Sequence, residues 1–209
     1  MLRPKLVLVA GTLAGCAALV AHAQAPTPAP TTAAAPAATA PVTAPSPAAT
    51  PASPATPASV KTTEVIHALV LPMKGSYMQH EAALVQLGTQ LGALRIQPAG
   101  PPFGRYFDDV TQVGEANATW EVGFPIAGEV TVAAPFVVKD VPAALSAVVV
   151  QEGPYETSAA SAMPALISWV MSNGYRPVGP PMLIFAGDPT ATGSGGPRVE
   201  ARIPVVKTQ

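Results

Sequence analysis

GPPFGRYFDD at residues 100–109 returns, in altered form, as GPPMLIFAGDP at residues 179–189. The two Gly-Pro-Pro turns are 79 residues apart, and at the same shift Tyr106 falls on Phe185 and Asp109 on Asp188. In each copy the turn leads into aromatic and apolar residues and then an acidic stop, which is the pattern of a short strand between two turns. The repeated segment therefore predicts a short strand at the same position in each of two copies.

Other parts of the sequence repeat with nearly the same period. WEVGFPI at 120–126 aligns with VEARIPV at 199–205 at a shift of 79, and KGSY at 74–77 aligns with EGPY at 152–155 at a shift of 78. Solenoid repeats have periods of about 20 to 50 residues, so this spacing is too long for them. The sequence predicts two fused half-domains, at about 62–127 and 140–206.

The first 23 residues have the pattern of a secretory signal peptide. Arg3 and Lys5 provide a basic start, an apolar run follows, and Ala21-His22-Ala23 forms a small-residue cleavage site. Leu13-Ala14-Gly15-Cys16 also resembles a bacterial lipobox, in which Cys16 would be lipidated. The apolar run continues past Cys16, which favours cleavage after Ala23. We expect a periplasmic or secreted protein, with an outer-membrane lipoprotein as the alternative and membrane contact only if Cys16 is lipidated.

Residues 24–59 consist almost entirely of Ala, Pro, Thr and Ser, and they carry no charge. Such a segment cannot bury enough apolar surface to offset its ordering entropy, so it is predicted to be a disordered linker. Residues 60–209 are long enough for one domain with a substantial core. The formal net charge of the whole chain is −1, and residues 60–209 contain no basic run, so no nucleic-acid partner is expected.

Each half reads as strand, helix, strand, strand. The first strands are HALVLPM at 67–73 and LSAVVVQ at 145–151, both rich in β-branched or apolar residues and both followed by a glycine turn. A helical period follows, with Leu84, Leu87 and Leu91 in the first half and Met163, Leu166 and Val170 in the second. Pro164 leaves two readings open: Ser161 caps a short helix, or a longer helix is kinked.

The closing strands alternate between apolar and polar residues. The apolar faces are Trp120, Val122, Phe124 and Ile126 in one half, and Val199, Ala201, Ile203 and Val205 in the other. These faces suit packing against the helices. Glu121 and Glu200 then occupy the opposite face at the same strand position, and a pseudo-twofold arrangement would direct both carboxylates into a common groove.

The chain resembles the GyrI-like small-molecule-binding domain, also called the AraC-type effector-binding domain. The resemblance covers about residues 62–206 and is carried by EGPYETSAASAMPALISWVMSNGYRPVGPPMLIFAGDP and VEARIPV. It implies an α+β fold of two βαββ units, with an antiparallel sheet and two helices around a central groove. It also implies an apolar or cationic, often aromatic, organic ligand, with Glu200 as the groove carboxylate and with Trp169 and Tyr155 at positions that match the family.

Each candidate ligand-binding residue also has an ordinary structural interpretation. Glu200 has Arg198 and Arg202 beside it on the same face, and strand carboxylates are usually solvated. Trp169 can belong to the core. The remaining aromatic candidates are tyrosines: Tyr77 and Tyr155 can close turns, and Tyr106 can pack across strands. His80 lies on an apolar helix face and is expected to be a half-buried residue with its hydrogen bonds satisfied.

Catalytic patterns are sparse. The three histidines have no metal-ligand spacing, and no nucleophile elbow or phosphate loop is present, so no catalytic residue, cofactor or metal is predicted. Some relatives hydrolyse strained rings with a glutamate and aromatic neighbours, so a hydrolase that uses Glu200 is the alternative to a binding module. The related SOUL fold adds haem binding as a third possibility, although the sequence offers no persuasive axial ligand.

Overall fold

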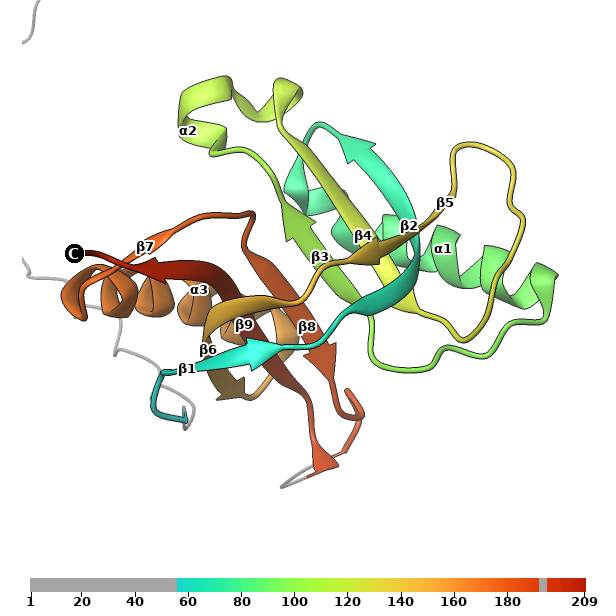
Figure 1. Cartoon of the computed structure of the whole chain (residues 1–209). Helices are drawn as coiled ribbons and strands as arrows, with labels where there is room; N and C mark the ends of the chain where they lie inside the picture. The colour runs from blue at the N-terminus through green and yellow to red at the C-terminus, as the bar shows by residue number, and fades with distance from the viewer. Residues whose placement is uncertain (1–55, 192–194) are drawn as a thin grey trace, which may run out of the picture. The chain divides into compact units, whose positions relative to one another are not determined.

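The first half of the domain begins with a strand that sequence patterning did not reveal. The computed structural model describes residues 56–191 and 195–209, so the predicted signal peptide, Cys16 and nearly all of the predicted linker lie outside the described residues. The elements of this half, coloured from cyan to yellow in Figure 1, are β1 (Ser59–Thr63), β2 (Ile66–Lys74), α1 (His80–Leu94), β3 (Phe103–Tyr106), α2 (Val110–Val113) and β4 (Thr119–Pro125), with 3-10 turns at Tyr77–Gln79 and Glu115–Asn117.

The second half has the same order of two strands, a long helix and two strands, with the short strand β7 added and without a counterpart of α2. Its elements are β5 (Val137–Val141), β6 (Ala144–Glu152), α3 (Tyr155–Ser172), β7 (Tyr175–Pro177), β8 (Met182–Ala186) and β9 (Arg198–Lys207). The two predicted βαββ units are therefore β2-α1-β3-β4 and β6-α3-β8-β9. The α+β fold class is confirmed.

Contacts at equivalent positions confirm that the halves are structural copies. Gly100 and Gly179 each lie so close to a proline of the closing strand, Pro125 and Pro204, that an added Cβ would approach the ring within 3.3 and 3.2 Å. The hydroxyl of Tyr77 donates to the carbonyl of Asp108 at 2.6 Å, and that of Tyr155 donates to Gly187 at 2.7 Å. Both tyrosines thus close the turn that follows a central strand, which is the structural role considered for them.

Asp109 and Asp188, which follow the repeated strand in each half, also form equivalent hydrogen bonds. Each carboxylate accepts a hydrogen bond from the backbone N–H and from the hydroxyl of a threonine two residues later, at 2.7–2.9 Å. Such local bonds end an extended segment, because they supply the backbone with partners outside the sheet. The sequence repeat at 100–109 and 179–189 is therefore a repeat of turn chemistry.

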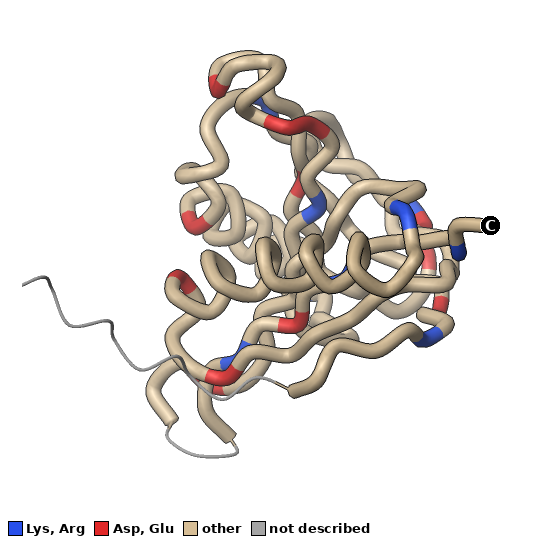
Figure 2. Tube along the Cα trace, turned by 90° about the vertical axis from the view of Figure 1, so that its left-hand side faces the viewer, with Lys and Arg blue, Asp and Glu red and all other residues tan. Residues whose placement is uncertain are grey.

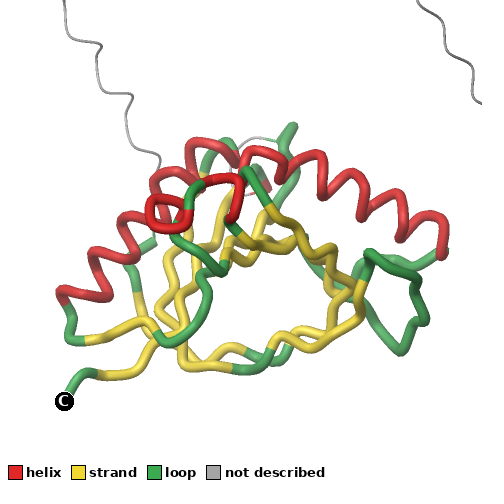
Figure 3. Tube along the Cα trace, turned by 90° about the horizontal axis from the view of Figure 1, so that it is seen from above, coloured by secondary structure: helices red, strands yellow, loops and turns green. Residues whose placement is uncertain are grey.

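One curled antiparallel sheet carries both halves, in the order β1-β6-β9-β8-β3-β4-β2-β5, with β7 paired to β9. The halves meet where β3 pairs with β8, so that Phe103 faces Ile184 across the junction. Helices α1 and α3 both lie on the same side of the sheet, as the view from above shows (Figure 3). In the described part of the chain, no helix of similar length covers the other face of the sheet.

The two halves exchange a strand. β1, the first strand of the first half, pairs with β6 of the second half. β5, the first strand of the second half, pairs with β2 of the first half. Both ladders keep one register: Thr63 pairs with Ala144 and, three residues along each strand, Ile66 pairs with Val141. The chain segments β1-β2 and β5-β6 therefore form one long ribbon, which crosses the helix-free face in front of the sheet (Figures 1 and 3).

Three groups of buried side chains hold the layers together. Two lie between the sheet and the helices, where Leu87 and Leu91 of α1 contact Trp120 and Val122, and where α3 packs on the alternate residues of β9. The predicted apolar faces of the closing strands are confirmed. A third, smaller group lies on the helix-free face, and its members are Ala68, Val70, Phe103, Val141, Met182 and Ile184.

Helix α3 runs without interruption from Tyr155 to Ser172 with Pro164 inside it. Of the two readings of this segment, the short helix capped by Ser161 is wrong. The Ser161 hydroxyl instead donates to the carbonyls of Thr157 and Ser158 within the helix. Burial of Ala162, Leu166 and Val170 against the sheet keeps the helix together although Pro164 has no N–H to donate.

Candidate functional site

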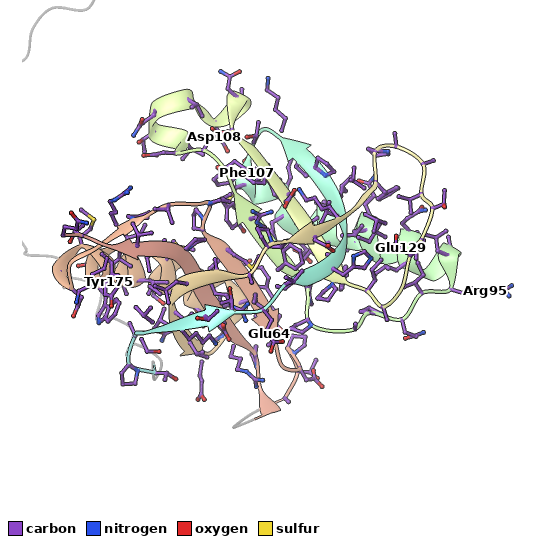
Figure 4. All side chains as sticks on the ribbon, in the orientation of Figure 1. Glu64, Arg95, Phe107, Asp108, Glu129 and Tyr175 are labelled. Atoms are coloured by element: carbon purple, nitrogen blue, oxygen red, sulfur yellow. The ribbon has the colours of Figure 1, made fainter. Side chains whose placement is uncertain are left out.

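A cavity of about 500 Å³ lies between the crossing ribbon and the helix-free face of the sheet. Residues 61–66, the end of β1 and the joint to β2, form one wall. Apolar side chains on the sheet, among them Phe103, Val150 and Ile184, line the opposite side. Glu64 marks the joint in Figure 4, at the front of the molecule. The cavity therefore has an apolar floor and a rim that belongs to the exchanged strand.

Glu200 lies in this cavity, and its charge is already balanced. Its Oε1 accepts hydrogen bonds from Nζ of Lys61 at 3.1 Å and from Nε of Arg202 at 2.6 Å. Its side chain is 21% exposed. Burial alone would raise the pKa of the Glu200 carboxyl, but the hydrogen bonds and positive charges of Arg202 and Lys61 outweigh burial and hold this pKa below its ordinary value.

Glu121 occupies the equivalent position in the first half but is buried, with 2% of its side chain exposed. Its Oε1 accepts from a terminal nitrogen of Arg105 at 2.8 Å and its Oε2 from Nζ of Lys139 at 2.5 Å. The Arg105 guanidinium also lies 5.3 Å from the ring centre of Phe107, which is labelled in Figure 4. Glu121 is not among the residues that line the cavity. The structure thus places both predicted carboxylates on the same face, but only Glu200 reaches the open volume.

The lysine partners come from the exchanged strands. Lys61 belongs to β1 yet contacts Glu200 of the second half, and Lys139 belongs to β5 yet contacts Glu121 of the first. Neither lysine was among the residues predicted from the sequence to bind a ligand. A signal was present, because Val60-Lys61 recurs as Val138-Lys139 at the shift of 78 that aligns the glycine turns. The duplication therefore begins upstream of the predicted boundaries at residues 62 and 140.

The arginine partners differ between the halves, and this difference explains why only one carboxylate is accessible. In the first half Arg105 of β3 reaches Glu121, and the position equivalent to Arg105 in β8 is Ile184. In the second half the arginine is instead Arg202 of β9, whose counterpart in β4 is Gly123. Phe103 lies directly over Gly123, and its ring would come within 2.3 Å of a Cβ added there. The Phe103 ring thus fills the first half, and the second half stays open.

The predicted aromatic residues lie on the other side of the sheet, together with the helices. Tyr77 and Tyr106 have ring centres 4.9 Å apart and pack on the core beneath α1. Tyr155 packs edge-to-face on Phe185 at 5.7 Å, and Trp169 stacks on Tyr175 of β7 at 6.1 Å, beside α3 (Figure 4). The structure does not bring Tyr77, Tyr106, Tyr155 or Trp169 to the cavity that Glu200 lines.

His80 lies at the start of α1, where the two halves meet on the helix side. Its ring is 4.7 Å from that of Phe185 and stacks on Tyr106 and Trp120. Burial lowers the pKa of His80 to about 4. Its Nε2 has no hydrogen-bond partner among the residues that the structure describes, and the same holds for the hydroxyl of Ser158, the equivalent residue of α3. The expectation that the hydrogen bonds of His80 are satisfied is therefore wrong.

Metal-binding clusters and membrane-spanning helices are both absent from the described residues. Residues 56–191 and 195–209 contain no group of three or more His, Cys, Asp or Glu that could hold a metal ion. In the same ranges, no helix is both long and apolar enough to cross a bilayer. The residues that line the cavity include no His, Cys, Met or Tyr, so they do not fit haem, which requires an axial ligand.

Comparisons with known proteins agree with this architecture. A family model described as "GyrI-like small molecule binding domain" matches residues 59–206. No curated protein is significantly similar to the chain. Among solved structures, the C-terminal domain of EcmrR is 20% identical with a TM-score of 0.57, and the match covers 73% of this chain and 98% of that one.

Two further structures show the same fold at low identity. EcmrR in a complex with DNA is 18% identical with a TM-score of 0.62; the match covers 73% of this chain but spans only 58% of EcmrR. A hydrolase from Listeria innocua is 12% identical with a TM-score of 0.51, over 71% of this chain and 91% of the hydrolase. At these identities the structural likeness establishes the fold only.

Proposed function

Because residues 59–206 belong to the family of GyrI-like small molecule binding domains, we propose that this chain binds a small organic ligand in the cavity beneath the crossing ribbon. The observation that carries the proposal is an unfilled volume of about 500 Å³ on the face that the strand pattern leaves free of helices. Ligand sites have volumes of about 300 to 1,000 Å³, with mostly apolar walls and a few polar groups that orient the ligand.

The two surfaces of the cavity suit different parts of a ligand. Phe103, Val150 and Ile184 offer an apolar surface for a ring or chain, whereas Glu200 and its basic neighbours supply directional hydrogen bonds. Polar groups inside a partly apolar cavity discriminate strongly, because a ligand that leaves them unpaired forfeits their solvation. We therefore infer a ligand with an apolar body and at least one polar group.

We also propose that the protein is an exported binding module on a tether. This part of the proposal is supported by the basic start, the apolar run and the Ala21-His22-Ala23 site of residues 1–23, and by the composition of residues 24–59. A binding domain held by a long, uncharged segment rich in Ala and Pro can sample the space around its point of attachment. The module would then capture its ligand outside the cytoplasm.

A hydrolase is less consistent with the geometry. A glutamate that acts as a general base needs a pKa near the working pH, and aromatic neighbours would have to lie beside it. The pKa of Glu200 is instead held low by Arg202 and Lys61, and the candidate aromatic residues lie across the sheet. The similarity to the Listeria innocua hydrolase therefore supports the fold of this chain but not a hydrolytic activity.

The binding proposal can be tested with a thermal-shift screen of the chain from Gln24 to Gln209, because a ligand that binds only the folded state raises the melting temperature by mass action. Two variants fill the cavity: Ala186→Phe at the end of β8 and Thr62→Trp on β1, both at lining positions. Ala160→Phe, on the exposed side of α3, is the matched control. A genuine ligand should bind the control as it binds the unmodified chain and lose about tenfold or more in affinity with both filled variants. Binding that survives both would refute the cavity as the site.

A further inference from the structure

The charges around the cavity do not match a cationic ligand. The lining contains three basic residues, Lys61, Arg198 and Arg202, and two acidic ones, Glu64 and Glu200. The buried cluster in the first half adds Arg105 and Lys139 against Glu121 alone. The chain has 11 basic residues in all, and five of them lie on this one face (Figure 2 colours the basic and acidic positions). Both clusters thus have an excess of positive charge.

The two equivalent carboxylates on the sheet, Glu200 and Glu121, are both already paired with two basic groups. Lys61 and Arg202 both donate to Glu200, and Arg105 and Lys139 both donate to Glu121. A ligand cation approaching Glu200 would meet two positive groups within hydrogen-bond distance of the same oxygen. Opposite charges favour and like charges oppose binding most strongly in partly buried sites, where water screens them least.

Arg202, in contrast, still has N–H groups that could donate hydrogen bonds to a ligand. Arg202 contacts Glu200 through Nε, and its two terminal nitrogens form no hydrogen bond or ion pair in the described part of the chain. A guanidinium has five N–H donors in a fixed fork that suits a carboxylate, phosphate or sulfonate. Arg198, Glu200 and Arg202 alternate along β9, so that the two arginines flank Glu200 on one face, about 7 Å from it on either side.

We propose that the ligand of this cavity is an amphipathic organic anion. Its apolar part lies on Phe103 and Ile184, and its anionic group is held by Arg202 together with Lys61 and Arg198. This inference rests on the proposed binding function and departs from the cationic ligand that the family resemblance implied. The position of Lys61 is central to it, since the exchanged strand β1 delivers a positive charge to the rim of the cavity.

Two matched hydrophobic ions test the sign of the ligand directly. Tetraphenylborate and tetraphenylphosphonium have nearly the same size and shape and opposite charge, and triphenylphosphine oxide is a neutral comparison. Affinities would be measured by calorimetry in sodium buffers with the chain from Gln24 to Gln209. We expect tetraphenylborate to bind about tenfold tighter than tetraphenylphosphonium, with a difference that decreases as salt is added.

Variants assign the preference to the cavity. In a Lys61→Gln, Arg202→Gln double variant, Glu200 loses both partners, so the preference should reverse in favour of the phosphonium ion. Lys74→Gln, at the exposed end of β2, removes a basic residue outside the cavity and should leave the preference unchanged. Ala186→Phe should weaken all three probes equally.

The possible failures are distinguishable. Equal or tighter binding of tetraphenylphosphonium to the unmodified chain would overturn the anionic ligand and leave the proposed binding function standing. A preference for the borate that persists in the double variant would also overturn it, because the charge responsible would lie elsewhere. Binding that is insensitive to Ala186→Phe, or no binding of any probe, would count against the proposed function itself.

Discussion

Lys61 and Glu200 form an ion pair at 3.1 Å although they lie 139 residues apart, on the first and the last strands along the chain, β1 and β9. The equivalent pair, Lys139 and Glu121, joins the second half to the first in the opposite direction. Each half thus completes the other's polar cluster, and the two clusters differ mainly in burial. Glu121 is almost fully buried, and Glu200 is in contact with solvent.

This difference in burial predicts unequal effects on stability. Glu121→Gln leaves Arg105 and Lys139 without their counter-ion in a buried site, so it should reduce the free energy of unfolding by about 3 kcal/mol. Glu200→Gln disrupts a half-exposed cluster and should cost about 1 kcal/mol or less. Urea unfolding at pH 7 measures both. Equal losses would show that the exposed fraction does not decide the strength of these two clusters.

His80 predicts a dependence of stability on pH. Its pKa is about 4 in the folded protein and about 6.5 when unfolded, so between these values the unfolded chain binds more protons than the folded one. Stability should therefore fall as pH is lowered from 6.5 to 4, by up to about 3 kcal/mol from this residue. His80→Phe should abolish most of that slope in thermal melts.

His67 provides the control for this slope. Its ring bonds to Asp140 at 2.7 Å, and this hydrogen bond, together with the Asp140 charge, raises the pKa of His67 despite some desolvation. A raised folded pKa contributes stability that is present at low pH and is lost as pH rises through it. His67→Gln should therefore leave the decline below pH 6.5 in place or steepen it, opposite to His80→Phe.

Gly123 controls the shape of the cavity floor. A Cβ at this position would lie 2.3 Å from the ring of Phe103, which is 1% exposed, so the ring would have to shift. Gly123→Ala should cost about 1 to 3 kcal/mol through overpacking and should weaken ligands by displacing the ring into the cavity. Gly88→Ala on α1, where nothing lies within 4 Å, should instead stabilise the helix by about 0.5 to 1 kcal/mol. Differential scanning calorimetry of both variants makes the comparison.

The export proposal predicts the N-terminal residue of the mature protein. Intact-mass spectrometry of the chain expressed in a bacterial host with a periplasm should find Gln24 as the first residue. A lipidated Cys16 would instead identify the lipoprotein pathway. Recovery of the full chain from Met1 in the cytoplasmic fraction would refute export.

Sequence patterning predicted what depends on short-range periodicity. The alternation of residues 120–126 and 199–205 correctly assigned their apolar faces to the helices, because strand geometry fixes which neighbours share a face. The same alternation placed Glu121 and Glu200 opposite the helices. It carried no information on how deeply each would be buried, since that depends on Phe103 and the ribbon, which are distant in sequence.

The pairing of strands that are distant in sequence could not be predicted from these patterns. That β1 pairs with β6 and not with its own half follows from how the whole sheet curls, and Lys61 therefore gave no sign of a partner 139 residues away. Trp169 lies three residues after Leu166, at the edge of the buried face of α3, and it packs against the core there, which is the ordinary structural interpretation considered for it. A resemblance to a family transfers residue types more readily than it transfers the side of the sheet on which they lie.

The exchanged strand β1 has a mechanical consequence. The chain enters the domain through β1, which pairs only with β6 in the described sheet and carries Lys61 just two residues after its first paired residue, Ser59. Tension applied through the N-terminal segment would peel this strand from its free end, one pair of hydrogen bonds after another. Lys61 would leave Glu200 as soon as Ala58 and Val60, which pack against the core cluster beneath α3, have come away. A pulling force on the chain before β1 would then also open the cavity.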